Sequence, residues 1–134
     1  MDELRSKRYR DKIQHIFDYI QELPLEAKNE LEKRGIFYSL QTSIEAMVDL
    51  IAMLVKDLGI QVKDDNFNIS EIVKIRKLNP GLGEKLRKAN GLRNIIVHRY
   101  NQIDDKLILD SIKDVKNLLI QWIKIVEECL NEIE

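Results

Sequence analysis

The segment GLRNIIVHRYN gathers most of the side chains in this sequence that could do acid–base or phosphate chemistry. Arg93 and His98 are five positions apart, Asn94 comes four before the histidine, and Arg99 and Tyr100 follow it directly. Arginine offers permanent charge and bidentate contact to a phosphate, and histidine can take or give a proton near neutral pH. This combination fits a phosphodiester substrate better than a carbonyl or glycosidic one.

The spacing of these residues leaves two interpretations open. On an ideal helix, residues five apart are turned by about 140° and separated by about 7.5 Å along the axis. Asn94 and His98, four apart, share one face. Cations at the carboxyl end of a helix are also favoured by the helix dipole, which requires no function at all.

Two carboxylates earlier in the chain are second-tier candidates for the same site. Glu45 and Asp49 are four positions apart in a long apolar pattern that predicts a helix. Asp49 stands among apolar neighbours, so we expect it to be partly buried and to need a partner. Arg93 is the partner that we expect, and the pattern favours a purely structural salt bridge over a catalytic role.

The other residues with chemical potential favour structural roles. His15 has no ligand or nucleophile at helical spacing, and Cys129 lies on the apolar seam of the last predicted helix, as a core thiol would. Gly81 and Gly83 lack the third glycine and the preceding strand of a dinucleotide-binding loop. With no pair of histidines or cysteines and no calcium-type acidic loop, we expect neither a metal site nor a cofactor.

Apolar periodicity predicts an all-α fold with about five helices. The last helix carries apolar residues at steps of four and three over its whole length, the pattern of a helix packed along a partner. Gly59 is expected to cap the second helix, and Ser70 to cap the third. Pro80 and the glycines after it are expected to form a turn. The expected helices cover residues 2–21, about 26–58, 70–79 and 83–98, and one from the loop NQIDD to the end.

Length and composition agree with one soluble helical domain over residues 1–134. The chain is 44% hydrophobic, 34% charged and 6% aromatic, and its five glycines and two prolines disfavour a turn-rich β fold. A single cysteine, no charged-then-apolar leader and no uninterrupted apolar run of membrane-spanning length lead us to expect a cytoplasmic protein that does not contact a membrane.

The net charge of −1 conceals an uneven distribution. Residues 63–100 carry nine Lys or Arg against four Asp or Glu, a local charge of about +5. A basic surface of this kind suits a ligand that bears phosphate, although solvated outer faces of helices give the same pattern.

The string RNIIVHRY resembles the R-N-x-x-x-H-x-Y signature of HEPN-domain proteins, and specifically of HepT-like toxins paired with minimal nucleotidyltransferase antitoxins. The resemblance extends over most of the chain, through LQTSIEAMVDLIAMLV, LRKANGLRNIIVHRYNQID and the long last helix. Met53 departs from the pattern, because many relatives carry a polar residue there, often histidine. That departure concerns a secondary contribution from the second helix.

The resemblance implies an up-and-down HEPN-like bundle that forms a two-fold homodimer, with the R-x4-H motifs near the axis and metal-independent RNase activity. It assigns catalysis to Arg93 and His98, contact with the RNA phosphate to Asn94 and Arg99, and attachment of AMP by the nucleotidyltransferase to Tyr100. An RNase toxin is the first functional hypothesis. The alternatives are a non-catalytic subunit that presents nucleotide or substrate to the nucleotidyltransferase, and a helical dimerisation module.

Overall fold

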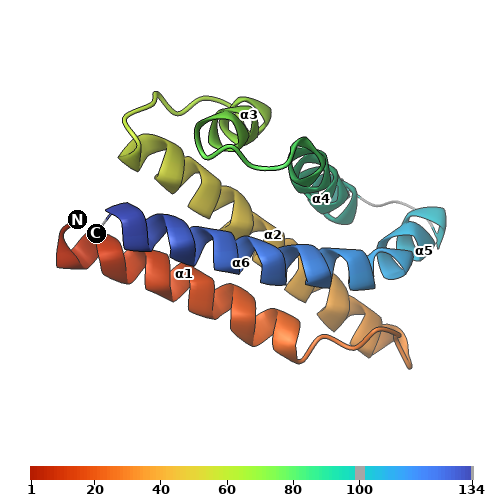
Figure 1. The fold of residues 1–134 in the computed structure, drawn as a ribbon. Coiled ribbons are helices and arrows are strands. Elements are labelled where there is room, and N and C mark those ends of the chain that lie inside the picture. The colour runs from red at the N-terminus through yellow and green to blue at the C-terminus, as the bar shows by residue number, and fades with distance from the viewer. Residues whose placement is uncertain (99–101, 134) are drawn as a thin grey trace.

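The computed structural model describes residues 1–98 and 102–133 and places them in helices joined by short loops (Figure 1). No strand occurs within these two ranges, so the predicted all-α class is confirmed. The helices are α1 (Glu3–Gln21), α2 (Glu30–Asp57), α3 (Asp65–Ile75), α4 (Pro80–His98), α5 (Gln102–Asp110) and α6 (Ile112–Ile133).

The long helix α2 is the centre of the bundle. It packs against α1, α3, α4 and α6, and α1 also contacts α6. In Figure 1 both termini lie at the left-hand end, so α1 runs antiparallel to α6, while α2 returns behind them. Helices α3 and α4 cover the other side of α2, and α5 joins the far end of α4 to the start of α6.

The core is built from the apolar stripes that the sequence predicts. Trp122 and Met47 are fully buried, and Cys129 is a buried thiol, as expected. Burial of one large apolar side chain contributes about 1.5–3 kcal/mol, so these stripes fix which faces of α2 and α6 turn inward. By length and composition α2 could cross a membrane, but 56% of its most apolar window is buried inside the protein, as in a core helix.

Helix α2 ends as predicted and begins later than predicted. Gly59 has a φ of 84°, the left-handed conformation that glycine adopts without a steric cost, and the Ile60 amide donates to the Val55 carbonyl. At the other end, the Asn29 side chain accepts a hydrogen bond from the Glu32 amide. Because Asn29 caps the helix, the first residue is Glu30 and not a residue near 26.

The predicted start of the third helix at Ser70 is wrong. Asp64 is the N-cap and accepts a hydrogen bond from the Phe67 amide, so α3 begins at Asp65. Ser70 lies within the helix and donates to the Asn66 carbonyl.

Helix α4 also begins earlier than expected, at Pro80. Proline suits the first helical position because its missing N–H has no partner there. Gly83 therefore lies in the helix and not in a turn. A Cβ at Gly83 would lie 3.1 Å from Val73 Cγ2, so this glycine permits the close approach of α3 and α4.

The single last helix expected from the sequence is in fact two, separated at Ser111. The Ser111 hydroxyl donates to the Leu107 carbonyl, and the Ser111 amide donates to the Ile108 carbonyl in a tighter turn. A serine that bonds back to the preceding turn often bends a helix, although Ser70 makes the same bond within the unbroken α3. The apolar periodicity continues through Ser111, so the sequence pattern does not reveal the break.

Candidate functional site

Arg93 is held on α4 by a carboxylate of α2. Its Nε and one terminal nitrogen each lie 3.2 Å from Glu45 Oε1, and its other terminal nitrogen donates to Asn94 Oδ1 at 3.2 Å. The Gln41 amide donates to the same Glu45 oxygen at 3.0 Å. About one third of the Arg93 side chain is exposed, so the guanidinium is oriented by the protein and still accessible to a ligand.

The expected pairing of Asp49 with Arg93 is wrong. Asp49 is exposed and pairs with Lys12 of α1 at 3.0 Å. Glu45 and Asp49 are one turn apart on α2, but α4 packs beside Glu45 and α1 beside Asp49. Among the described residues of the motif, Arg93 is contacted by Glu45 and not by Asp49.

Asn94 and His98 are exposed on the last turns of α4. The same helix geometry that brings these two to one face turns His98 by about 140° from Arg93. One copy of the chain thus directs the arginine toward α2 and the histidine toward another side. The remaining predicted site residues, Arg99 and Tyr100, lie outside the described residues.

The other sequence candidates take structural places. The His15 ring bonds to the Thr42 hydroxyl at 2.8 Å and packs on Tyr19. Met53 is partly buried against the core. Burial raises the pKa of the Cys129 thiol, which keeps it protonated. Within the described ranges no three His, Cys, Asp or Glu residues gather as a metal site would require.

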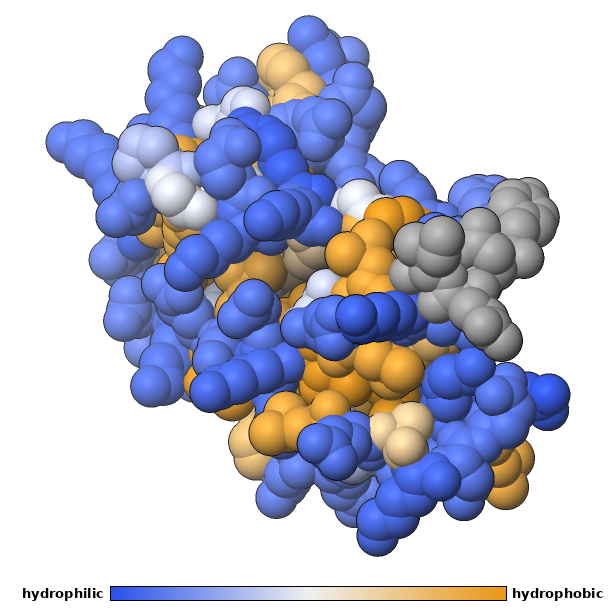
Figure 2. Space-filling view, turned by 90° about the vertical axis from the view of Figure 1, so that its right-hand side faces the viewer, coloured by the Kyte–Doolittle hydropathy of each residue, from blue (hydrophilic) through white to orange (hydrophobic). Residues whose placement is uncertain are grey.

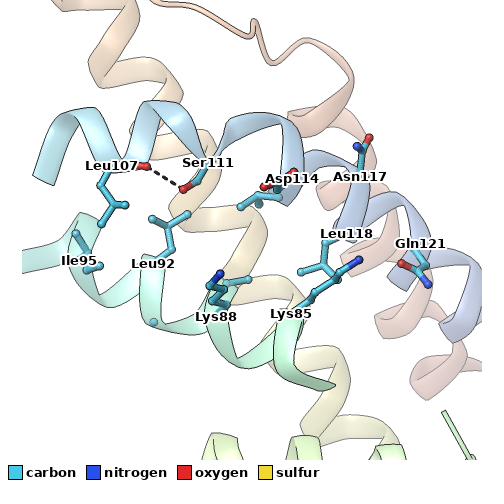
Figure 3. Close-up of a pocket in the computed structure, with 13 residues that line it drawn as sticks. Lys85, Lys88, Leu92, Ile95, Leu107, Ser111, Asp114, Asn117, Leu118 and Gln121 are labelled. Carbon is cyan, nitrogen blue, oxygen red and sulfur yellow. Dashed lines mark hydrogen bonds between the residues drawn. The ribbon is translucent and has the colours of Figure 1, made fainter. Parts of the chain in front are cut away.

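A pocket of about 680 Å³ opens between α4, α5 and α6 and was not predicted. Its floor is apolar, with Leu92, Val115 and Leu118 nearly buried. Lys85 and Lys88 extend from α4 toward α6 (Figure 3). The face at the right-hand end of Figure 1 likewise has apolar surface between hydrophilic margins (Figure 2). The sequence signal for this pocket was the pair Lys85 and Lys88 within the basic segment. The α6 residues that face these lysines become known only from the packing of α6 against α4.

Comparison with known proteins agrees with this architecture. Residues 7–126 match the family model described as "Ribonuclease HepT-like". Two proteins of Archaeoglobus fulgidus, each named "Putative RNase", are 45% identical over 98% of this chain and 99% of theirs, and 36% identical over 92% and 95%.

Solved structures share the fold at lower identity. A mutant of an MntA–HpeT toxin–antitoxin complex gives a TM-score of 0.78 at 17% identity, covering 90% of this chain and 98% of the other. A tri-AMPylated Shewanella oneidensis HEPN toxin in complex with MNT antitoxin gives a TM-score of 0.69 at 18% identity. The match covers 96% of this chain and 99% of the toxin chain. The resemblance to HepT-like proteins that the motif indicates is confirmed. The chain belongs to the HepT-like ribonuclease family.

Proposed function

We propose that this chain is a metal-independent endoribonuclease toxin that cleaves RNA with Arg93 and His98 and is neutralised by a nucleotidyltransferase antitoxin. The observation that carries the proposal is the placement of the R-N-x-x-x-H motif. The arginine is oriented by Glu45 while remaining partly exposed, and the histidine is exposed on the last turn of the same helix.

RNA supplies its own nucleophile, so the protein needs few groups. A base removes the proton of the 2′-hydroxyl, whose oxygen attacks the phosphorus while the bond to the 5′-oxygen breaks. An acid protonates that leaving oxygen, and the products are a 2′,3′-cyclic phosphate and a 5′-hydroxyl. Histidine suits the proton transfers, and a fixed guanidinium stabilises the charge that develops on the phosphoryl oxygens. No step requires a metal ion.

A homodimer would supply what one chain lacks. Each copy offers one motif histidine, while the reaction uses a base and an acid. Two-fold symmetry places two copies of one surface opposite each other, so two histidines and two arginines can share a cleft. The exposure of Asn94 and His98 leaves this end of α4 open to a second copy and to RNA.

The proposed control is chemical modification beside the motif. Attachment of AMP to the Tyr100 hydroxyl would add a bulky anion two residues from His98. The added group would exclude an RNA phosphate by both charge and volume. The two solved neighbours named above are toxin–antitoxin complexes, one of them with an AMPylated toxin, which supports this partner class.

A non-catalytic subunit that presents nucleotide to the transferase is the second candidate. The exposed basic residues of α4 would serve it equally well, but it gives no role to an arginine fixed by a carboxylate.

The deciding experiment is cleavage of a labelled RNA by purified protein in excess EDTA. We expect the wild type to cut and to leave cyclic phosphate ends, and His98→Ala and Arg93→Ala to lose at least a hundredfold in rate. Asp49→Asn is the matched control and should retain activity. If unmodified wild type cuts nothing, with Tyr100 shown by mass spectrometry to carry no AMP, the toxin proposal fails and the subunit proposal replaces it.

A further inference from the structure

The pocket between α4, α5 and α6 ends about one turn of α4 before the motif histidine, and His98 lies beyond one margin of the α4 face that lines it. Lys88, Gly91 and Ile95 line it at steps of three and four, which is the spacing of one helix face. His98 continues this series three residues beyond Ile95, about 4.5 Å farther along the axis. An occupant that leaves the pocket past Gly91 and Ile95 would therefore pass the margin of α4 on which His98 lies.

The lining of the pocket changes in character along its length (Figure 3). Ile95, Leu92 and Leu107 gather at the end nearest the motif. Asp114, Asn117 and Gln121 follow one another along α6, and Lys85 and Lys88 face them from α4. The pocket thus combines an apolar end, a row of hydrogen-bonding groups and two cations.

Lys85 and Lys88 are the two lysines of the basic segment that line the pocket. Arg76, Arg87 and Arg93 are paired with Glu132, Glu84 and Glu45, respectively. The ion pairs found among the described residues do not include Lys85 or Lys88, and both side chains are exposed. A ligand that joins an apolar planar group to negative charge complements this arrangement. A purely apolar helix of another protein would leave the lysines and the amides without partners.

We propose that this pocket binds the stretch of RNA adjoining the scissile phosphate. The neighbouring base enters the apolar end, and the amides and carboxylate of α6 bond to its edge, which gives base preference. Lys88 and Lys85 lie about 15 and 20 Å from His98 along the helix axis, so they contact phosphates other than the one that is cleaved. This proposal rests on the proposed ribonuclease function and adds where the substrate strand lies.

The first test fills the pocket. A Cβ at Gly91 meets nothing within 4 Å, and Gly91 lines the pocket, so Gly91→Phe introduces a ring at the pocket wall from a position with open space around its Cβ. Gly35→Phe is the matched control, because it is also an exposed helical glycine with nothing within 4 Å. The probe is a fluorescent single-stranded RNA with 2′-O-methyl groups throughout. It is not cleaved, because the 2′-hydroxyl nucleophile is blocked. We expect Gly91→Phe to weaken binding, and to raise KM for unmodified RNA, by about tenfold, with Gly35→Phe unchanged.

The second test removes the cations and does not depend on the pocket-filling variant folding. For single-stranded RNA, log affinity falls with log salt, and each lost phosphate contact lowers the steepness of that fall by about 0.7. The double variant Lys85→Gln and Lys88→Gln should therefore lower it by about 1.4. Lys124→Gln, an exposed lysine of α6 outside the pocket, should not change it.

The outcomes separate this proposal from the proposed function. Suppose that wild type cleaves RNA, and that both Gly91→Phe and the double lysine variant bind and cleave RNA as well as wild type does. Only the pocket proposal is then overturned. If wild type neither binds nor cleaves RNA, both proposals fall. If Gly91→Phe keeps its RNA affinity but no longer co-purifies with a nucleotidyltransferase, the pocket docks a protein and the proposal is overturned.

Discussion

At the scale of single residues, the ion pair between Arg93 and Glu45 serves orientation more than stability. Both side chains are about one third or more exposed, and pairs of that exposure contribute only about 0–1 kcal/mol to folding. The two guanidinium nitrogens on one carboxylate oxygen, with Gln41 on the same oxygen, fix the direction of the arginine. A guanidinium that already points in the right direction before substrate binds does not have to reorient during the reaction, so no free energy is spent on reorganisation.

We therefore expect Glu45→Gln to reduce catalysis more than stability. The neutral amide cannot hold the guanidinium as firmly, so kcat should fall about tenfold or more while KM changes little. Asp49→Asn is the matched control, since Asp49 lies one turn away on α2 and pairs with Lys12 instead. Both variants should lose less than about 1 kcal/mol of unfolding free energy. Equal kcat values for the two variants would show that Glu45 is only structural.

At the scale of helices, a partly buried polar contact joins α1 to the end of α2. The Tyr9 hydroxyl and the Arg5 guanidinium both donate to Asp57 Oδ2. Tyr9 is fully buried, and burial, followed by the hydrogen bond to the carboxylate, raises its pKa well above the ordinary value of 10. The folded protein therefore holds the tyrosine proton at pH values where the unfolded chain releases it.

This contact predicts how stability depends on pH. Because the pKa of Tyr9 is higher in the folded state, its contribution is complete below pH of about 10 and declines above it, by up to about 1.4 kcal/mol per pH unit. Tyr9→Phe should cost about 1.5–3 kcal/mol at pH 8, the cost of a hydrogen bond to a charged group. In urea titrations from pH 8 to 11, the gap between wild type and Tyr9→Phe should narrow above pH 10. A gap that stays constant would contradict this assignment.

Sequence patterns predicted the features that local backbone chemistry determines. They missed the features that depend on how the helices pack against one another. The all-α class, the Gly59 cap and the buried thiol follow from periodicity and backbone conformation, and the structure has all three. Glu45 and Asp49, in contrast, are one turn apart on α2, so spacing could not tell which of them faces α4. The apolar pattern runs unbroken through Ser111, where α5 ends and α6 begins, so periodicity could not show the break.

At the scale of the whole molecule, the fold places the two proposed catalytic residues on different sides of α4. Arg93 pairs with Glu45 of α2, whereas His98, turned by about 140° from Arg93, is exposed on the last turn of α4. A chain with one motif histidine does not assemble a base and an acid by itself. The proposed dimer therefore makes a quantitative prediction about mixed assemblies, because two subunits must share each site.

Co-expression of wild type and His98→Ala chains with different tags tests that prediction. Random pairing leaves about one quarter of the dimers with two intact histidines. If each cleft uses both histidines, the rate of RNA cleavage per total protein should fall to about one quarter of the wild-type value at an equal mixture. Wild type mixed with Lys124→Gln should keep full activity, and a pull-down through both tags verifies that mixed dimers form. A fall to one half would mean that each histidine acts alone, and the dimer would then serve some purpose other than completing the site.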